Sequence, residues 1–289
     1  MKETDKLLFK NSVFNRPDDA NKGTLGSLLC ICGSYGMAGA AIMAGKAALR
    51  CGIGLLKIAV PKSIYPICAS NMLESVYYPL KETDIGAVSA DNINFLLSAC
   101  EKSSAVLIGC GLSVCDDTKE LVKAVITNCT KPIVIDADAL NCICDEPQIL
   151  NHLKAPAIIT PHPGEMARLL HTTSKAVNSD RENTAINFAK KYGVVTVLKG
   201  AGTIIAAPNG TAYINHTGNS GMATGGSGDV LAGIIGSLLS QGANPLNAAA
   251  AGVFLHGTVG DLAAEKLGKI SMLPTDMIEL LPIAYQKLL

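Results

Sequence analysis

The sequence predicts an α/β fold in which a doubly wound, mostly parallel sheet carries helices on both faces and a β-hairpin extension. Continuously apolar short runs alternate with helix-length segments, which is the pattern of parallel strands buried on both faces. Hydrophobic residues make up 48% of the 289-residue chain and charged residues 17%, enough apolar material for one large core. The turn sequence Pro208–Gly210 between two apolar runs predicts the hairpin.

The expected elements follow one another in chain order. Buried strands are expected over 25–33, 54–60, 105–112, 132–137, 157–160 and 194–199. Helices are expected over 38–51, 92–103, 117–129 and 180–192, with Gly193 as a C-cap. The hairpin strands follow over 203–207 and 211–215, and helices over 229–241, 245–267 and after Pro274 complete the chain. Because no repeat or linker interrupts the pattern, we expect residues 1–289 to form a single domain.

Composition and charge exclude several classes of function. The 24 basic residues balance 24 acidic ones, so the chain lacks the cationic surplus that nonspecific binding to nucleic acid or an anionic membrane requires. No apolar run reaches the roughly 18 residues of a spanning helix, and the polar N-terminus does not resemble a signal peptide. The ten cysteines lack zinc-ligand spacing and lie mostly in apolar runs, as reduced core thiols do. We therefore expect a soluble, cytoplasmic protein.

A first glycine-rich stretch, 33–41, follows an expected strand and opens an expected helix. Its glycines are spaced GxxGxxG rather than GxGxxG, and no acidic residue closes the next strand at Lys57–Pro61, so a dinucleotide fingerprint is not matched. Taken alone, the stretch favours a tight turn between a strand and a helix. Its small residues would equally suit a floor on which a flat ligand lies.

A second glycine-rich stretch, 218–229, precedes the apolar helix of the C-terminal third. Its glycines allow consecutive amides to converge on one point at a helix N-terminus, which predicts an anion hole made of Gly225, Gly226, Ser227 and Gly228. This stretch contains no lysine and so differs from a P-loop. Asp229 lies in the first helical turn, where it is either a general base or a capping acid; the surrounding glycines favour the catalytic interpretation.

These residues resemble a known group of enzymes. The segment Gly225–Asp229 resembles the anion hole and catalytic aspartate of the ribokinase-like superfamily. The segment Thr160–Glu165 resembles that superfamily's Thr-Pro-Asn-x-x-Glu motif, in the His-Pro-Gly variant that marks the ADP/ATP-dependent NAD(P)H-hydrate dehydratases. The resemblance continues at other ordered motifs, including 39–41, 109–112, 136–141, 198–200 and 255–257.

The resemblance implies a repair enzyme that returns the S epimer of NADH or NADPH hydrate to the reduced cofactor. The hydroxyl would be phosphorylated by ADP, giving AMP, or by ATP, and phosphate would then be eliminated. Asp229 would be the catalytic base, and Mg²⁺ would be oriented by Glu165 through water. The hydrate would be bound by Ala40, Gly111, His162 and Asp229. The nucleotide would be bound by Lys199, Gly200, Ala201, Gly202, Thr203 and Gly228.

The sequence leaves several points open. A ribokinase-like kinase for a thiazole or pyrimidine vitamin precursor would share the anion hole and Asp229 but stop at the phosphate ester, and a nucleotide sensor would lack the chemistry altogether. Cys110 stands where the family usually has proline, and Asp136 and Asp138 are either magnesium ligands or ties for a loop. Family likeness and the apolar run 248–255 lead us to expect a homotetramer. The short segment before the first strand leads us to expect a separate epimerase partner.

Overall fold

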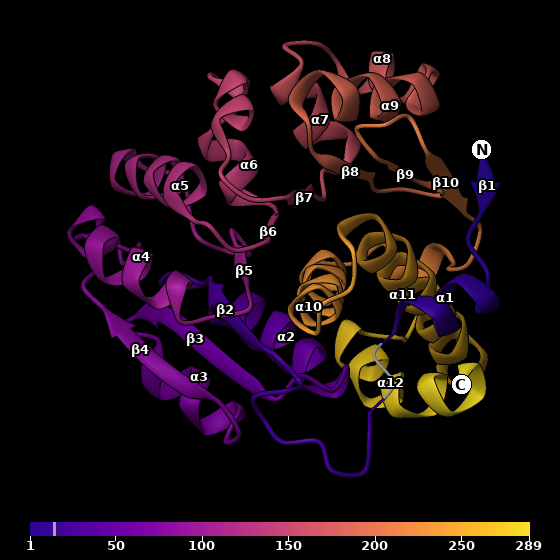
Figure 1. Ribbon diagram of the computed structural model, residues 1–289, viewed down its shortest axis with the longest axis horizontal. Helices are drawn as coiled ribbons and strands as arrows, with labels where there is room; N and C mark the ends of the chain where they lie inside the picture. The colour runs from indigo at the N-terminus through magenta and orange to yellow at the C-terminus, as the bar shows by residue number, and fades with distance from the viewer. Residues whose placement is uncertain (14–15) are drawn as a thin grey trace.

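The strands pair into one large sheet covered by helices (Figure 1). The computed structural model describes residues 1–13 and 16–289. Within these residues the sheet has ten strands, in the order β1 (Lys2–Glu3), β10 (Ala212–Asn215), β9 (Thr203–Ala206), β8 (Val195–Leu198), β7 (Ala157–Ile159), β6 (Ile133–Ile135), β5 (Ala105–Ile108), β2 (Ser27–Ile31), β3 (Leu55–Pro61) and β4 (Val76–Leu80). Neighbours from β8 to β4 are parallel, whereas β9 is antiparallel to β8 and β10. The expected fold class and hairpin are confirmed.

Each face of the sheet has its own hydrophobic core, because successive side chains of a strand point to opposite faces. In β2, Leu28 and Cys30 enter one core and Leu29 and Ile31 enter the other. The first core is covered by α1 (Lys6–Ser12), α2 (Ala38–Arg50), α3 (Tyr65–Asn71), α10 (Ser227–Ser240), α11 (Pro245–Leu267) and α12 (Pro274–Leu288). The second is covered by α4 (Ile93–Glu101), α5 (Asp116–Asn128), α6 (Asp138–Cys142), α7 (Pro163–Leu169), α8 (Ser174–Ser179) and α9 (Arg181–Tyr192).

The chain reverses its direction of travel across the sheet at β2. It first passes outward to β3 and β4 and then returns to the other side of β2 as β5, from which it continues through β6, β7 and β8. A sheet of this kind binds ligands beyond the carboxyl ends of its strands, at the point of reversal. The segments that follow β2, β5, β6, β7 and β8 all lie at that edge and include the sequence-predicted motifs at 33–41, 109–112, 160–165 and 199–203.

Helix α10 is apolar all round because it is enclosed on every side. It lies between α2 and α11 and packs on the sheet (Figure 1). Gly233 brings α10 very close to α2: a Cβ atom at this position would lie 2.1 Å from the carbonyl oxygen of Ala44. The N-terminus of α10 is thereby fixed beside the carboxyl ends of the strands.

Several expected boundaries differ from the observed ones. The strand expected over 105–112 ends at Ile108, because Gly109 and Gly111 adopt positive φ values of 125° and 62° that leave the ladder. The helix expected from Asp229 begins at Ser227. Strand β4 is not among the expected elements; Pro79 is tolerated in it because the strand forms an edge of the sheet.

The apolar run 248–255 is buried in the interior of the folded protein. Its side chains belong to the core beneath α10 and α12. The expectation that this run forms a face between subunits is therefore wrong. No helix among residues 1–13 and 16–289 is both long and apolar enough to cross a bilayer.

Candidate active site

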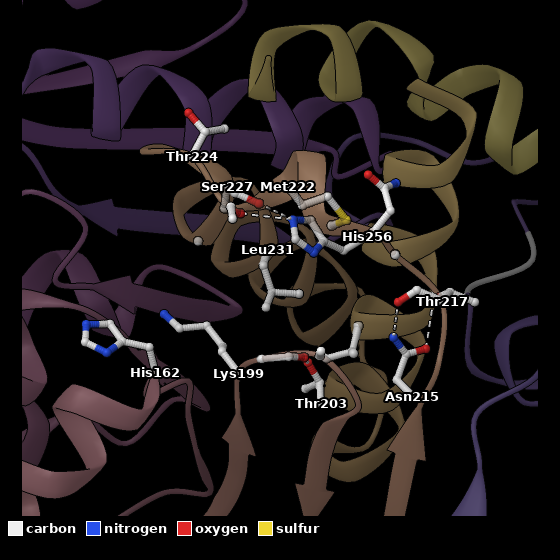
Figure 2. Close-up of a pocket in the computed structure, with 18 of the residues that line it drawn as sticks. His162, Lys199, Thr203, Asn215, Thr217, Met222, Thr224, Ser227, Leu231 and His256 are labelled. Atoms are coloured by element: carbon white, nitrogen blue, oxygen red, sulfur yellow. Dashed lines mark hydrogen bonds between the residues drawn. The ribbon is translucent and has the colours of Figure 1, made fainter. Parts of the chain in front are cut away.

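A cavity of about 830 Å³ opens at the carboxyl ends of β6, β7 and β8. Its lining contains most of the residues that the sequence singles out, namely His162, Lys199, Gly200, Ala201, Gly202, Thr203, Gly225, Gly226, Ser227, Gly228 and Asp229. In Figure 2, His162 and Lys199 extend from the strand ends, and Ser227 lies opposite them at the start of α10. The fold thus brings His162 and Lys199, which are 37 residues apart in the sequence, into one cavity.

The predicted anion hole forms the N-terminus of α10. Gly226 is the N-cap with a φ of 99°, a left-handed conformation that favours glycine, and no side chain caps the helix. The amide of Ser227 donates to the carbonyl oxygen of Thr224 at 3.3 Å, whereas those of Gly228 and Asp229 have no side-chain cap and keep their hydrogen-bonding capacity for a ligand. A Cβ atom at Gly225 would meet nothing within 4 Å, so this part of the loop has open space around it.

His256 on α11 holds the first residue of α10 in place. Its Nε2 lies 2.9 Å from the carbonyl oxygen of Ser227, and because a carbonyl only accepts, Nε2 carries the proton (Figure 2). Burial lowers the pKa of His256 to about 4, so the imidazole is neutral near pH 7. His256 is not among the site residues expected from the sequence. Its partner lies on another helix, and no spacing rule joins the two.

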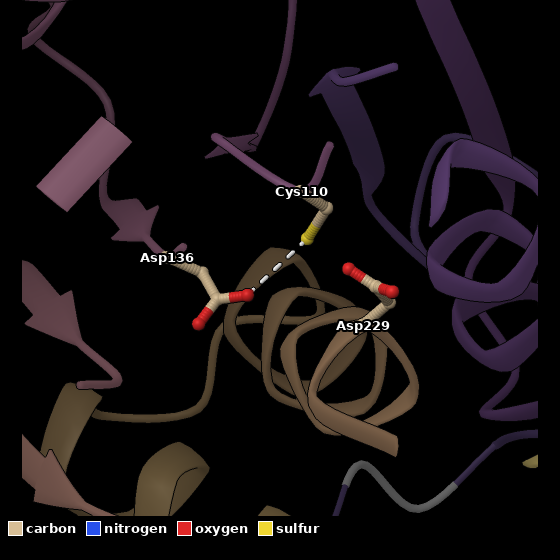
Figure 3. Close-up of side chains that lie close together, drawn as sticks. All are labelled: Cys110, Asp136 and Asp229. Atoms are coloured by element: carbon tan, nitrogen blue, oxygen red, sulfur yellow. Dashed lines mark hydrogen bonds between the residues drawn. The ribbon is translucent and has the colours of Figure 1, made fainter. Parts of the chain in front are cut away.

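Asp229 faces two other potential ligand side chains across the cavity floor. One ligand atom each of Cys110, Asp136 and Asp229 lies within 4.8 Å of the others (Figure 3). Burial, together with the negative charge of Asp136, raises the pKa of Asp229 to about 6. A carboxylate with this pKa is ionised at pH 7 and more basic than an ordinary aspartate, which suits removal of a proton from a hydroxyl.

Asp136 is a buried carboxylate with three hydrogen-bond donors. Its Oδ1 accepts from Thr160 Oγ1 at 2.6 Å and from Lys199 Nζ at 3.0 Å, and its Oδ2 accepts from Cys110 Sγ at 3.5 Å. The residue is 1% exposed, so the ion pair with Lys199 offsets part of the cost of burying its charge. Asp136 therefore belongs to the floor of the site.

Asp138 has a different role. It begins α6 instead of continuing β6, and its Oδ2 accepts from the backbone N–H of Ser113 at 2.9 Å. Ser113 has a positive φ of 65°, an uncommon conformation for a residue with a side chain. The carboxylate of Asp138 thus ties down the loop after β5.

His162 and Glu165 form a capping box at the start of α7. Glu165 Oε2 accepts from the backbone N–H of His162 at 2.8 Å, and His162 Nδ1 accepts from the backbone N–H of Gly164 at 2.9 Å. The Glu165 side chain is 6% exposed and lies behind the cavity lining, whereas that of His162 is 50% exposed and reaches it. Burial lowers the pKa of His162, which favours the neutral imidazole.

Ala40 and Gly111 lie side by side at the point of chain reversal, outside the lining of the large cavity. A Cβ atom at Gly111 would come 2.7 Å from Cβ of Ala40, and Ser34 Oγ donates to the carbonyl oxygen of Gly111 at 2.9 Å. The absence of a side chain at Gly111 lets the loop after β5 approach α2. Gly111, which follows Cys110 in the chain, is buried, and Ala40 is half-buried.

We expect the charge of Asp229 to destabilise the fold, which makes the effect of Asp229→Asn depend on pH. Its pKa of about 6 in the folded chain exceeds the value of ~3.9 in an unfolded one, so the folded state binds more protons between these values. The stability of the wild type should therefore fall, relative to the variant, as pH rises from about 4 to about 6. At pH 7 the variant should be more stable by on the order of 2 kcal/mol.

Urea denaturation of both proteins between pH 4 and pH 8 measures this difference. A gap that opens between pH 4 and pH 6 and then stays constant is the expected result. A difference that is independent of pH, or a variant less stable than the wild type at pH 7, would contradict it.

The chain is similar to known proteins of one family. The family model described as NAD(P)H-hydrate dehydratase matches residues 28–283. A bifunctional NAD(P)H-hydrate repair enzyme of Moorella thermoacetica is 43% identical over 279 residues, covering 96% of this chain and 53% of the relative. An ADP-dependent (S)-NAD(P)H-hydrate dehydratase of Neisseria meningitidis is 37% identical over 265 residues, covering 91% of this chain and 85% of the relative. The chain thus spans about half the length of the bifunctional relatives.

Solved structures agree with the fold. The ADP/ATP-dependent NAD(P)H-hydrate dehydratase of Bacillus subtilis, co-crystallised with ATP and Mg²⁺, has a TM-score of 0.85 and 28% identity, covering 100% of this chain and 99% of that one. A ribokinase of Thermotoga maritima has a TM-score of 0.54 at 14% identity, covering 88% of this chain and 98% of that one, and shows the fold alone. The expected ribokinase-like architecture is confirmed.

Proposed function

The chain belongs to the NAD(P)H-hydrate dehydratase family, and from this premise we propose that it removes water from the S epimer of NADH or NADPH hydrate in a nucleotide-dependent reaction. The observation that carries the proposal is the position of Asp229. Its carboxylate lies in the first turn of α10, beside an uncapped helix N-terminus and in the lining of the large cavity. A base and an anion hole at one point are the requirements for transferring a phosphoryl group to a hydroxyl.

In the proposed first step, the hydroxyl of the hydrate attacks the terminal phosphorus of the nucleotide. Asp229 takes the hydroxyl proton as the new O–P bond forms, and the bond between the terminal phosphorus and its bridging oxygen breaks. The amides around Gly228 donate to the phosphoryl oxygens as their charge grows. They are held in position before the reaction by the contact between His256 and Ser227, so little reorganisation is needed.

In the proposed second step, the hydroxyl oxygen leaves with the phosphate and the nicotinamide double bond is restored. The lone pair of the ring nitrogen drives the C–O bond to break, which phosphorylation makes easier because phosphate is a better leaving group than hydroxide. The iminium ion that results loses a proton from the adjacent ring carbon to the departing phosphate or to water, and this loss restores the double bond. His162, with its neutral and accessible imidazole, would contact the hydrated ring. Ala40 and Gly111 would let the flat dinucleotide lie close to the backbone.

The side chains at the cavity floor suit Mg²⁺. Glu165 and Asp136 supply carboxylate oxygens, the donors that this ion prefers, and Glu165 lies behind the lining, where it would act through water. When bound, the ion would neutralise phosphate charge. Lys199, Gly200, Ala201, Gly202 and Thr203 line the cavity and would hold the nucleotide. We propose ADP as donor, giving AMP, because the Neisseria relative is named as ADP-dependent.

The test is to incubate the purified protein with chemically prepared NADPH hydrate, Mg²⁺ and ADP, ATP or neither nucleotide. Recovery of the reduced-nicotinamide absorbance with ADP, together with one AMP per NADPH, is the expected result. Recovery of the absorbance with ATP but not with ADP would show that ATP is the phosphoryl donor. Stable accumulation of a phosphorylated hydrate would instead show a kinase, and no reaction with either nucleotide would overturn the proposal.

A further inference from the structure

The fold supplies the anion hole with a lysine that its own sequence segment lacks. Lys199 follows β8, and its side chain lines the cavity on the same side as His162 (Figure 2). A Cβ atom built at Gly228 would lie 3.4 Å from Nζ of Lys199, so the ammonium and the backbone of the anion hole are close neighbours. The side chain is 18% exposed, and the cavity is where that exposed part lies.

Two carboxylates hold the ammonium of Lys199 at this point. Nζ lies 3.0 Å from Asp136 Oδ1 and 3.7 Å from Glu165 Oε2. Thr160 Oγ1 donates to the same oxygen of Asp136 at 2.6 Å, which fixes that carboxylate. Two carboxylates at these distances favour the charged form of the ammonium.

The position of this cation has an electrostatic consequence. Asp136 and Glu165 are buried and carry like charge with a phosphate, so without Lys199 they would repel an anion in the cavity. The ammonium lies between them and the amides of α10. An ammonium has three donors, and the hydrogen bond to Asp136 uses one of them.

We propose that the ammonium of Lys199 is a catalytic group that contacts the phosphoryl group during its transfer, and that Asp136 is the residue that positions it. This inference rests on the proposed function. As the O–P bond to the hydrate forms and the bridging P–O bond breaks, the proton passes to Asp229 and AMP leaves. Lys199 keeps its proton and stabilises the growing charge on the phosphoryl oxygens. If Lys199 instead served the nucleotide only through its backbone, its ammonium would be dispensable.

The experiment compares Lys199→Met and Lys199→Arg with the surface control Lys190→Met, for kcat and for binding. Lys199→Met should lower kcat with ADP by about 10²-fold or more, the usual cost of removing one donor to a developing anion. Affinity for AMP alone, measured by calorimetry, should change by less than about 3-fold, because AMP lacks the transferred group. Affinity for AMP with fluoroaluminate and Mg²⁺, which mimics the transferring phosphoryl group, should fall with kcat. Lys190→Met should match the wild type.

Two further variants keep the inference open to contradiction even where Lys199→Met folds poorly. Lys199→Arg retains the charge and should keep more activity than Lys199→Met, and Asp136→Asn should lose fluoroaluminate affinity while Lys199 is intact. Wild-type affinity for AMP with fluoroaluminate in both Lys199 variants would overturn the proposal. A wild type that does not dehydrate the hydrate yet binds this mimic through Lys199 would contradict the proposed function and leave the phosphoryl contact standing.

Discussion

Asp229→Asn is expected to lower kcat for hydrate dehydration by about 10²- to 10⁴-fold, the range over which a positioned general base contributes. Asparagine keeps the size and one acceptor oxygen of the side chain but cannot take the proton. Because the nucleotide contacts at 199–203 are untouched, affinity for the nucleotide should be nearly unchanged. Initial rates of absorbance recovery give kcat, and calorimetry with AMP gives the affinity.

The expected stability gain of this variant separates lost chemistry from lost structure. A variant that is at least as stable as the wild type and still inactive has lost the base. Retention of a tenth or more of the wild-type kcat would contradict the role assigned to Asp229. It would indicate that the anion hole and the leaving group suffice without proton removal.

Gly233→Ala is expected to give the largest loss of stability among single-methyl additions in α10. Its Cβ atom would lie 2.1 Å from the carbonyl oxygen of Ala44. Because the three nearest atoms all belong to the backbone of Ala44, no flexible side chain can move aside to make room. Helices α2 and α10 would have to separate, at a cost of about 3 kcal/mol or more, which outweighs the ~1 kcal/mol that alanine gains over glycine in a helix. The melting temperature should fall by roughly 6 °C or more.

Gly39→Ala in α2 is the matched control. A Cβ atom there meets only the methyl group of Met43 at 4.0 Å, so the substitution should be neutral or slightly stabilising. Thermal unfolding followed by circular dichroism compares the two variants. Equal melting temperatures for Gly233→Ala and the wild type would show that the crossing of α2 and α10 is looser than described.

The sequence predicts the central strands well because their apolar runs are continuous, as parallel strands buried on both faces must be. It also predicts the hairpin, since Asn209-Gly210 has a turn chemistry that few other structures use. It misses β4, whose Val76–Leu80 run is half exposed at the sheet edge and contains a proline. Helices α6 and α7 are missed because five and seven residues are too few to show a helical period, and α7 begins at a capping box that involves only His162 and Glu165.

The residues of the site likewise fall into those that the sequence predicts and those that it does not. Residues that form a contiguous motif, such as Gly225–Asp229, are predicted because one segment carries both the glycines and the acid. The contacts of Asp136 with Lys199 and of His256 with Ser227 join segments 63 and 29 residues apart, and each depends on how the strands and helices pack. No local pattern contains that information. The lysine near the anion hole, Lys199, is therefore not part of the motif Gly225–Asp229, and only the folded structure brings it there.

In the proposed reaction the hydroxyl oxygen of the hydrate leaves as part of a phosphate, and an isotope label follows that oxygen. NADPH hydrate carrying ¹⁸O in its hydroxyl would be turned over with ADP and Mg²⁺, and the released inorganic phosphate analysed by mass spectrometry. One ¹⁸O atom in each phosphate released is the expected result, because the C–O bond breaks after the O–P bond forms. Label in the water, with unlabelled phosphate, would contradict phosphorylation of the hydroxyl.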